Sequence, residues 1–98
     1  MRIRFLPEAE TELLEAAKWY REQSFGLDLE FMRCIDDSLA TIARLPKIFP
    51  QVHRQLRQAL IRRFPYAIFY EIKEDGIIVY AVFHFSRNPK RWKNRTDI

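Results

Sequence analysis

The 98 residues leave room for one domain around one hydrophobic core. Nearly half of them (48%) are hydrophobic and 14% are aromatic, a composition that favours a packed interior over a disordered chain. No apolar run approaches the roughly 18–20 residues of a membrane span, and the first residues lack the apolar stretch of a signal peptide. The single cysteine, Cys34, cannot form an internal disulfide. We therefore expect a cytoplasmic protein in which residues 1–98 form one domain.

The net charge of +4 conceals an asymmetry between the two halves of the sequence. Residues 1–45 hold six Lys/Arg and nine Asp/Glu, a net charge of −3, whereas residues 46–98 hold eleven and four, a net charge of +7. Such a basic half suggests a polyanionic partner, either nucleic acid or an acidic protein. The alternative is that lysine and arginine only keep a small domain soluble.

A short strand and two amphipathic helices are predicted for the first half. Charged and apolar residues alternate over Arg2–Leu6, which indicates a strand. Apolar residues then recur at spacings of three and four over Glu8–Gln23, after a proline that suits a first helical turn. Beyond Gly26 the same spacing predicts a second helix, which begins near Leu27 or Asp28 and ends at Leu45. The short link makes the two helices an antiparallel hairpin.

Three further strands are predicted for the basic half, after a loop over Lys47–Gln55. They span Leu56–Phe64, Tyr66–Lys73 and Ile77–Phe85, and the sequence Asp-Gly at 75–76 is a hairpin signal between the last two. Residues 86–98 form a basic tail. The order β-α-α-β-β-β predicts an α+β fold, with the helical hairpin packed on a mainly antiparallel four-stranded sheet.

Strict alternation predicts which side chains of the last strand share a face. Ile77, Val79, Ala81, Phe83 and Phe85 are expected on one face, and Ile78, Tyr80, Val82 and His84 on the other. Both faces are largely apolar, so we expect the sheet to be central and well covered.

Several segments resemble the RelE/ParE superfamily, in this order along the chain. A Pro-Glu-Ala-Glu helix start lies at 7–10, a Trp-Tyr pair at 19–20, and a Leu-Pro…Phe-Pro stretch at 45–50. The segment Arg62–Tyr70 is similar to a basic strand that runs through a Phe-Pro-Tyr turn. The segment Val82–Pro89, followed by Trp92, is similar to the motif of His, Arg, Pro and Trp at the end of the last strand. One departure is Phe85, where many relatives carry glycine.

This resemblance implies the toxin of a bacterial type II toxin–antitoxin system, neutralised by a cognate acidic antitoxin that wraps it. Operator DNA would be bound only through the antitoxin. ParE-like members poison DNA gyrase and have no catalytic site of their own, whereas RelE-like members are endoribonucleases that cut messenger RNA in the ribosome. Two features favour the ParE-like branch: a long helical hairpin, and no tyrosine or histidine after Arg87. The fold alone does not choose between the targets.

A RelE-like site would need a general base or acid and cations for the phosphate. His84 is the candidate for the first role, and Arg62, Arg63 and Arg87 are candidates for the second. The alternative for His84 is a packed or hydrogen-bonded structural role. Within the predicted strand Arg62 and Arg63 point to opposite faces, so at most one of them is expected to face a shared site.

The candidate contacts to the antitoxin or the target are basic or aromatic residues of the second half. They are Arg57, Arg87, Lys90, Arg91 and Trp92. Trp92 has an alternative role as an anchor that packs the tail on the domain. We expect Cys34 to be a core residue and His53 to be solvated in a loop. No residues have the spacing of metal ligands, and we expect no cofactor. A different class of function is a non-toxic module that binds nucleic acid.

Overall fold

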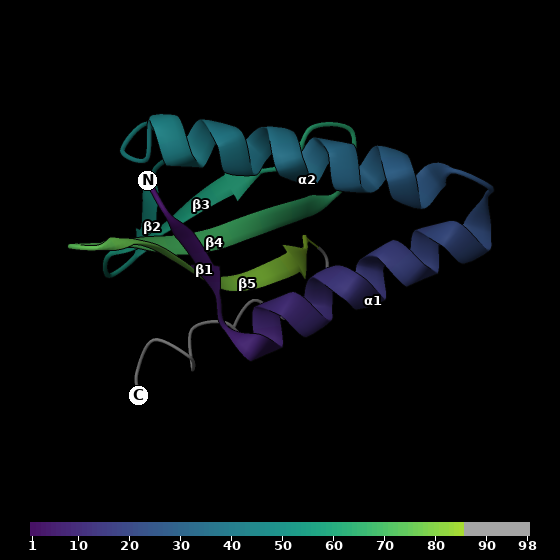
Figure 1. Ribbon diagram of the computed structural model, residues 1–98, viewed down its shortest axis with the longest axis horizontal. Coiled ribbons are helices and arrows are strands. Elements are labelled where there is room, and N and C mark those ends of the chain that lie inside the picture. The colour runs from purple at the N-terminus through teal and green to yellow at the C-terminus, as the bar shows by residue number, and fades with distance from the viewer. Residues whose placement is uncertain (86–98) are drawn as a thin grey trace.

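The computed structural model describes residues 1–85, which form two helices and a five-stranded sheet (Figure 1). The elements in chain order are β1 (Ile3–Phe5), α1 (Pro7–Gln23), α2 (Leu27–Arg44), β2 (Gln51–His53), β3 (Leu56–Leu60), β4 (Tyr66–Lys73) and β5 (Gly76–His84). The α+β class, the helical hairpin and the antiparallel pairing of the last strands are as predicted from the sequence.

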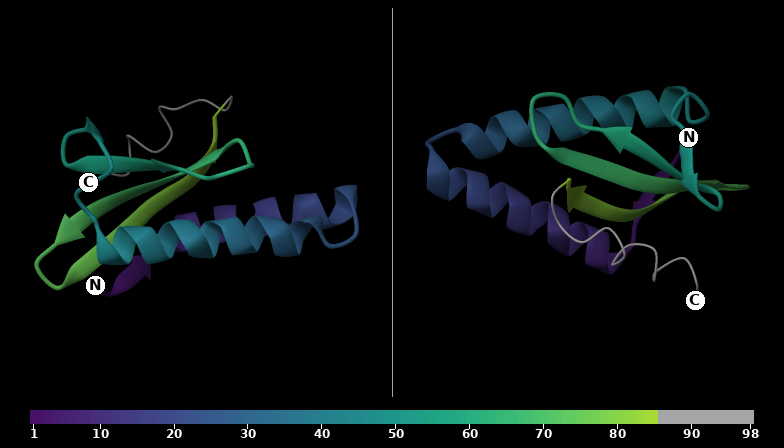
Figure 2. Two further views of the ribbon diagram at one scale, coloured as in Figure 1. Left: turned by 90° about the horizontal axis from the view of Figure 1, so that it is seen from above. Right: turned by 180° about the vertical axis from the view of Figure 1, so that it is seen from behind.

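The two helices lie side by side and antiparallel over one face of the sheet (Figures 1 and 2). Helix α1 has proline in its first turn, followed by Glu8 and Glu10 near the positive end of its dipole. Gly26 precedes α2 with a φ of +83°, a left-handed conformation that glycine adopts at little cost. This residue lets the chain reverse direction within the short link that joins the helices.

The strand order is β1-β5-β4-β3-β2, so the first strand pairs with the last. That pair is parallel, and the other three pairs are antiparallel. The predicted count of four strands was wrong, because Gln51–His53 in the predicted loop pairs with β3 as a fifth strand. A strand of three residues is too short to show a periodic signal.

The predicted strand Leu56–Phe64 also ends earlier than expected. It stops at Leu60 rather than Phe64, and residues 61–65 form the turn to β4. Arg63 has a φ of +71°, which a strand residue does not adopt. The prediction that Arg62 and Arg63 alternate across a strand was therefore wrong, because both lie in a turn.

A bulge in β5 overturns the predicted alternation of its side chains. Phe69 pairs with Ala81 but Tyr70 pairs with Val79, so β5 carries one extra residue at this point. Beyond the bulge the two faces exchange: Val82 joins Ile77 and Val79 in the core beneath the helices. Ala81 and Phe83 pack instead with Leu56, Ala67 and Phe69 in a second apolar cluster that contains no helical residue. Both faces of the sheet carry buried apolar side chains, as expected.

The loop between α2 and β2 is held against the sheet by Tyr70 and Arg57. The buried Tyr70 donates its hydroxyl to the carbonyl oxygen of Pro46 at 2.6 Å. Nη1 of Arg57 donates to the carbonyl oxygens of Phe49 at 2.6 Å and Lys47 at 3.2 Å. Burial raises the pKa of Tyr70, while the charge of Arg57 acts in the opposite direction. The loop conformation thus depends on side chains of two neighbouring strands.

We expect Tyr70→Phe to lower the free energy of unfolding by about 1–2 kcal/mol, because it leaves the Pro46 carbonyl without this donor. The raised pKa of Tyr70 also makes the free energy of unfolding depend on pH. Stability from the neutral phenol is complete below the unfolded-state pKa of about 10 and is lost as the pH rises through the higher folded-state pKa. Urea unfolding of the parent and of Tyr70→Phe, at neutral pH and above pH 10, measures the loss caused by the substitution and the loss caused by the rise in pH. A variant as stable as the parent would show that the hydrogen bond contributes nothing.

Candidate functional site

The end of β5 and the β3–β4 turn meet at one end of the sheet. The N–H of Phe85 donates to the carbonyl oxygen of Pro65 at 2.9 Å, and the N–H of Ile61 donates to that of Tyr66 at 2.9 Å. His84 is paired with Tyr66 across the β4–β5 ladder. The fold therefore brings His84 to the same end of the sheet as Arg62 and Arg63, as a site built from all three would require.

The two arginines of this turn are directed at acids of helix α2. Nη2 of Arg62 lies 3.4 Å from Oδ2 of Asp37, and Nη2 of Arg63 lies 3.9 Å from Oε2 of Glu30. The side chains of the first pair are 72% and 63% exposed, so each such pair contributes at most about 1 kcal/mol to stability. These ion pairs orient the guanidinium groups toward the helix rather than toward a common point beside His84.

His84 packs on the helix side of the sheet because of the bulge in β5. Its ring lies 5.2 Å from that of Tyr66 in an edge-to-face arrangement, with an interplanar angle of 82°. Tyr66 in turn belongs to the aromatic cluster, which we define as Tyr20, Phe31, Phe64 and Tyr66. The half-buried imidazole thus extends the aromatic packing of the core.

Sequence reasoning missed Glu12, which joins α1 to the same strand. Its Oε1 accepts the N–H of Val82 at 3.0 Å, two residues beyond the bulge. Strand β1 pairs only with Ile77–Val79 of β5, so it leaves this part of the β5 edge for the carboxylate. A signal was present, because Glu12 lies three residues after Ala9 and four before Ala16 on the buried stripe of α1.

The residues predicted to contact an antitoxin or a target divide into two groups. Arg57 is half-buried, and its Nη1 is engaged by the two loop carbonyls described above. Arg87, Lys90, Arg91 and Trp92 lie outside the described residues, as does the whole predicted tail 86–98. The binding role of all five stays a prediction.

The remaining candidates from the sequence occupy structural positions. Cys34 is 3% exposed in the helix-facing core, as expected. His53 lies in β2 rather than in a loop, so the expectation of a solvated loop histidine was wrong. Within residues 1–85 no three His, Cys, Asp or Glu side chains gather as metal ligands would. No helix in that range is long and apolar enough to cross a membrane.

Comparisons with known proteins identify a family and a solved structure that this chain resembles. The family model described as "ParE toxin of type II toxin-antitoxin system, parDE" matches residues 3–89. A solved structure described as "Chromosomal ParDE TA system from P. aeruginosa" is similar, with a TM-score of 0.72 and 15% sequence identity over 86% of this chain and 95% of that chain. A comparison with curated proteins gives no match.

The structural similarity shows a shared fold, and the family model spans most of the sequence. The chain belongs to the ParE toxin family of type II toxin–antitoxin systems. The resemblance to the ParE-like branch of the superfamily, drawn from the motifs in the sequence, is thereby confirmed.

Proposed function

We propose that this toxin arrests growth by poisoning DNA gyrase and that a cognate antitoxin neutralises it. The observation that carries the proposal is the ParE type of the family model, which spans residues 3–89. The resemblance drawn from the sequence implies gyrase as the target of ParE-like members and the ribosome as that of RelE-like members. Gyrase and antitoxin are both cytoplasmic, and we place the action of the chain there.

The arrangement of the candidate catalytic residues favours gyrase over messenger RNA. A ribonuclease site needs cations and a proton-transfer group that converge on one phosphate. Here Arg62 and Arg63 are directed at acids of α2, and the ring of His84 packs on Tyr66. The long hairpin, with helices of 17 and 18 residues, is a second feature that favours the ParE-like branch.

An antitoxin partner is favoured by the charge and exposed apolar residues of the chain. Residues 46–98 carry a net charge of +7, which suits an acidic segment. The hairpin also exposes large apolar side chains: Leu14 on α1, Leu29 on α2, and Phe25 in the link, whose side chain is completely exposed. A protein partner that covers these side chains would remove apolar surface from water.

The test compares the two targets directly. We expect induction of the protein to arrest growth, and co-expression of its cognate antitoxin to restore it. In purified reactions we expect gyrase-dependent cleavage of supercoiled DNA, and no cuts in messenger RNA in a translating extract. His84→Ala should retain gyrase poisoning. Ribosome-dependent cuts that disappear in His84→Ala or Arg87→Ala would instead establish the RelE-like alternative. Absence of growth arrest would favour the non-toxic nucleic-acid-binding module.

A charge-reversal variant tests whether basic residues contribute to antitoxin binding. We expect the change of both Arg87 and Lys90 to glutamate to weaken the complex by about tenfold or more, because two attractive contacts become repulsive. Affinity measured with the antitoxin that restores growth tests this. Equal affinity for the variant and the parent would contradict the proposed role of these two residues.

A further inference from the structure

A stretch of the sequence without acids forms the loop after α2 and one edge of the sheet. No aspartate or glutamate occurs between Asp37 and Glu71, and this stretch holds six lysine and arginine residues. Arg62 and Arg63 are paired with acids of α2, and Arg57 is engaged by the loop carbonyls. The other three cations are exposed, and we call them the basic edge: Arg44, Lys47 and Arg54.

The basic edge lies at the end of the molecule away from the link between the helices. Arg44 is the last residue of α2, Lys47 follows in the loop, and Arg54 lies in the turn between β2 and β3. Figures 1 and 2 show the end of α2, this loop and β2 together at that end. The bonds from Tyr70 and Arg57 to three loop carbonyls hold the loop, so a ligand would meet cations on a backbone that is already ordered.

The charge of the basic edge suits the phosphate backbone of DNA. Interfaces with DNA are much more positively charged than interfaces between proteins, in whose buried centres lysine is depleted. Strand β2 lies at the end of the strand order, and backbone N–H groups can donate to phosphate oxygens as well. Among residues 1–85 neither Arg44 nor Lys47 forms an ion pair, so no carboxylate there has to be displaced by a phosphate.

Three partly exposed apolar side chains lie among these cations: Leu45, Ile48 and Val52. An acidic protein surface would cover them, whereas contact with a DNA backbone depends on the cations. Single apolar side chains at a surface are common and do not by themselves mark a protein interface. The absence of acids over the whole stretch therefore favours DNA, and the apolar side chains provide a way to distinguish the two occupants.

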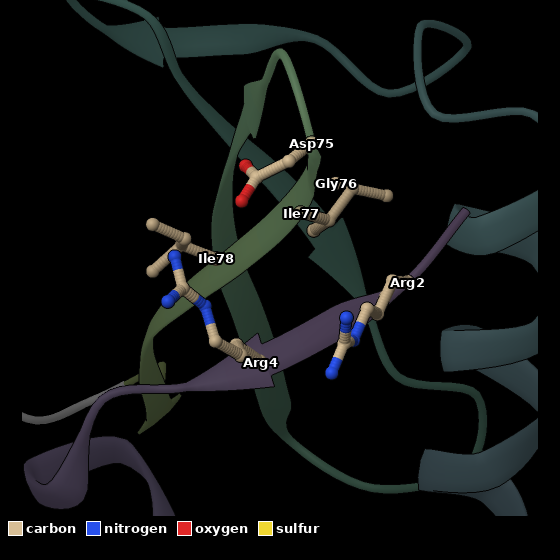
Figure 3. Close-up of a pocket in the computed structure, with 6 residues that line it drawn as sticks. All are labelled: Arg2, Arg4, Asp75, Gly76, Ile77 and Ile78. Atoms are coloured by element: carbon tan, nitrogen blue, oxygen red, sulfur yellow. The ribbon is translucent and has the colours of Figure 1, made fainter.

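Arg2 and Arg4 on β1 form a second exposed basic pair, but in a mixed electrostatic environment. Figure 3 shows their side chains beside the turn that carries Asp75. With residues 75–78 they line a cavity of about 130 Å³ between β1 and β5. An anion in that cavity would face the Asp75 carboxylate as well as the arginines. This pair is therefore a matched control for the basic edge.

We propose that the basic edge contacts phosphate groups of the DNA on which gyrase acts, so that the toxin binds the gyrase–DNA complex through the DNA as well as the enzyme. This inference rests on the proposed function, because that function supplies the DNA. The contact does not depend on base sequence, since phosphate contacts position a protein on a duplex without reading it. The affinity falls as the salt concentration rises, because each neutralised phosphate releases counterions.

The test measures binding of the full chain to a short, fluorescently labelled DNA duplex over a series of salt concentrations. We expect Arg44→Glu/Lys47→Glu to bind at least about tenfold more weakly, and to lower the slope of log affinity against log salt by about two. The control is Arg2→Glu/Arg4→Glu, because both variants lower the net charge from +4 to 0. We expect the control to lose less than about threefold, since distant exposed charges are screened by salt. Circular dichroism verifies that both variants fold.

Gyrase reactions with supercoiled DNA complete the test. We expect about tenfold more of the Arg44→Glu/Lys47→Glu variant to be needed for the same cleavage. Absence of DNA binding by the parent at low salt, or equal affinities for the two double variants, would overturn this inference. Cleavage lost in Ile48→Ala, with DNA binding unchanged in Arg44→Glu/Lys47→Glu, would assign the surface to an acidic protein instead. A parent that binds DNA through the basic edge but promotes no gyrase cleavage would contradict the proposed function alone.

Discussion

Phe31→Ala is expected to lower the free energy of unfolding by about 3–5 kcal/mol, a large part of the roughly 5–15 kcal/mol typical of a domain. The side chain is completely buried, and its ring lies 5.0 Å from Tyr20, 5.3 Å from Phe64 and 5.3 Å from Tyr66. Its removal would leave a cavity between α1, α2 and the β3–β4 turn. Urea unfolding followed by circular dichroism measures the loss.

The matched control for this variant is Leu29→Ala on the same helix. Leu29 is 65% exposed, so its truncation should change stability by no more than about 0.5 kcal/mol. Equal losses for the two variants would mean that helix propensity, rather than aromatic packing, sets the stability of α2.

Gly76→Ala is expected to destabilise the protein by about 3 kcal/mol or more, because steric overlap and backbone strain act together. Gly76 has a φ of +150°, and a Cβ atom there would collide with the carbonyl oxygen of Arg2. That oxygen accepts the N–H of Ile77, so the collision would push apart β1 and β5 where they pair. Thermal unfolding would show a lower midpoint.

The Gly26→Ala variant measures the cost of a positive φ without the steric overlap that an added Cβ causes at Gly76. Gly26 also has a positive φ, +83°, but no heavy atom lies within 4 Å of the position that a Cβ would take. We expect a loss of only about 1–2 kcal/mol, the cost of a left-handed conformation for a residue with a Cβ. If Gly76→Ala cost no more than Gly26→Ala, the close approach of β1 would not constrain the fold.

Helices and long strands were predictable because their signals are local and repeated. The apolar spacing of α1 and α2 runs over several turns, and both helices begin and end within a residue or so of the predicted bounds. The bulge between Val79 and Ala81 has no such signal, since Tyr80 fits either face of an alternating strand. It is imposed by pairing with β4 and is accompanied by the bond from Val82 to Glu12, 70 residues away in sequence.

The sequence predicted where the candidate site residues lie but not the directions in which their side chains point. The motif residues His84, Arg62 and Arg63 do lie at one end of the sheet. What sequence could not supply was the turn over residues 61–65, which directs the arginines at Asp37 and Glu30. Ion pairs between a turn and a distant helix depend on tertiary packing, and no spacing along the chain encodes them.

The parallel pairing of β1 with β5 has a consequence for how the protein is made. During synthesis β1 emerges first, but Ile3, Arg4 and Phe5 meet their partners only when Ile77, Ile78 and Val79 have followed. Contacts so far apart in sequence form late and slow the folding of a domain. A nascent chain that still lacks β5 cannot complete this sheet, and the toxin therefore acquires the final surface of the sheet only after Gly76–His84 have been synthesised.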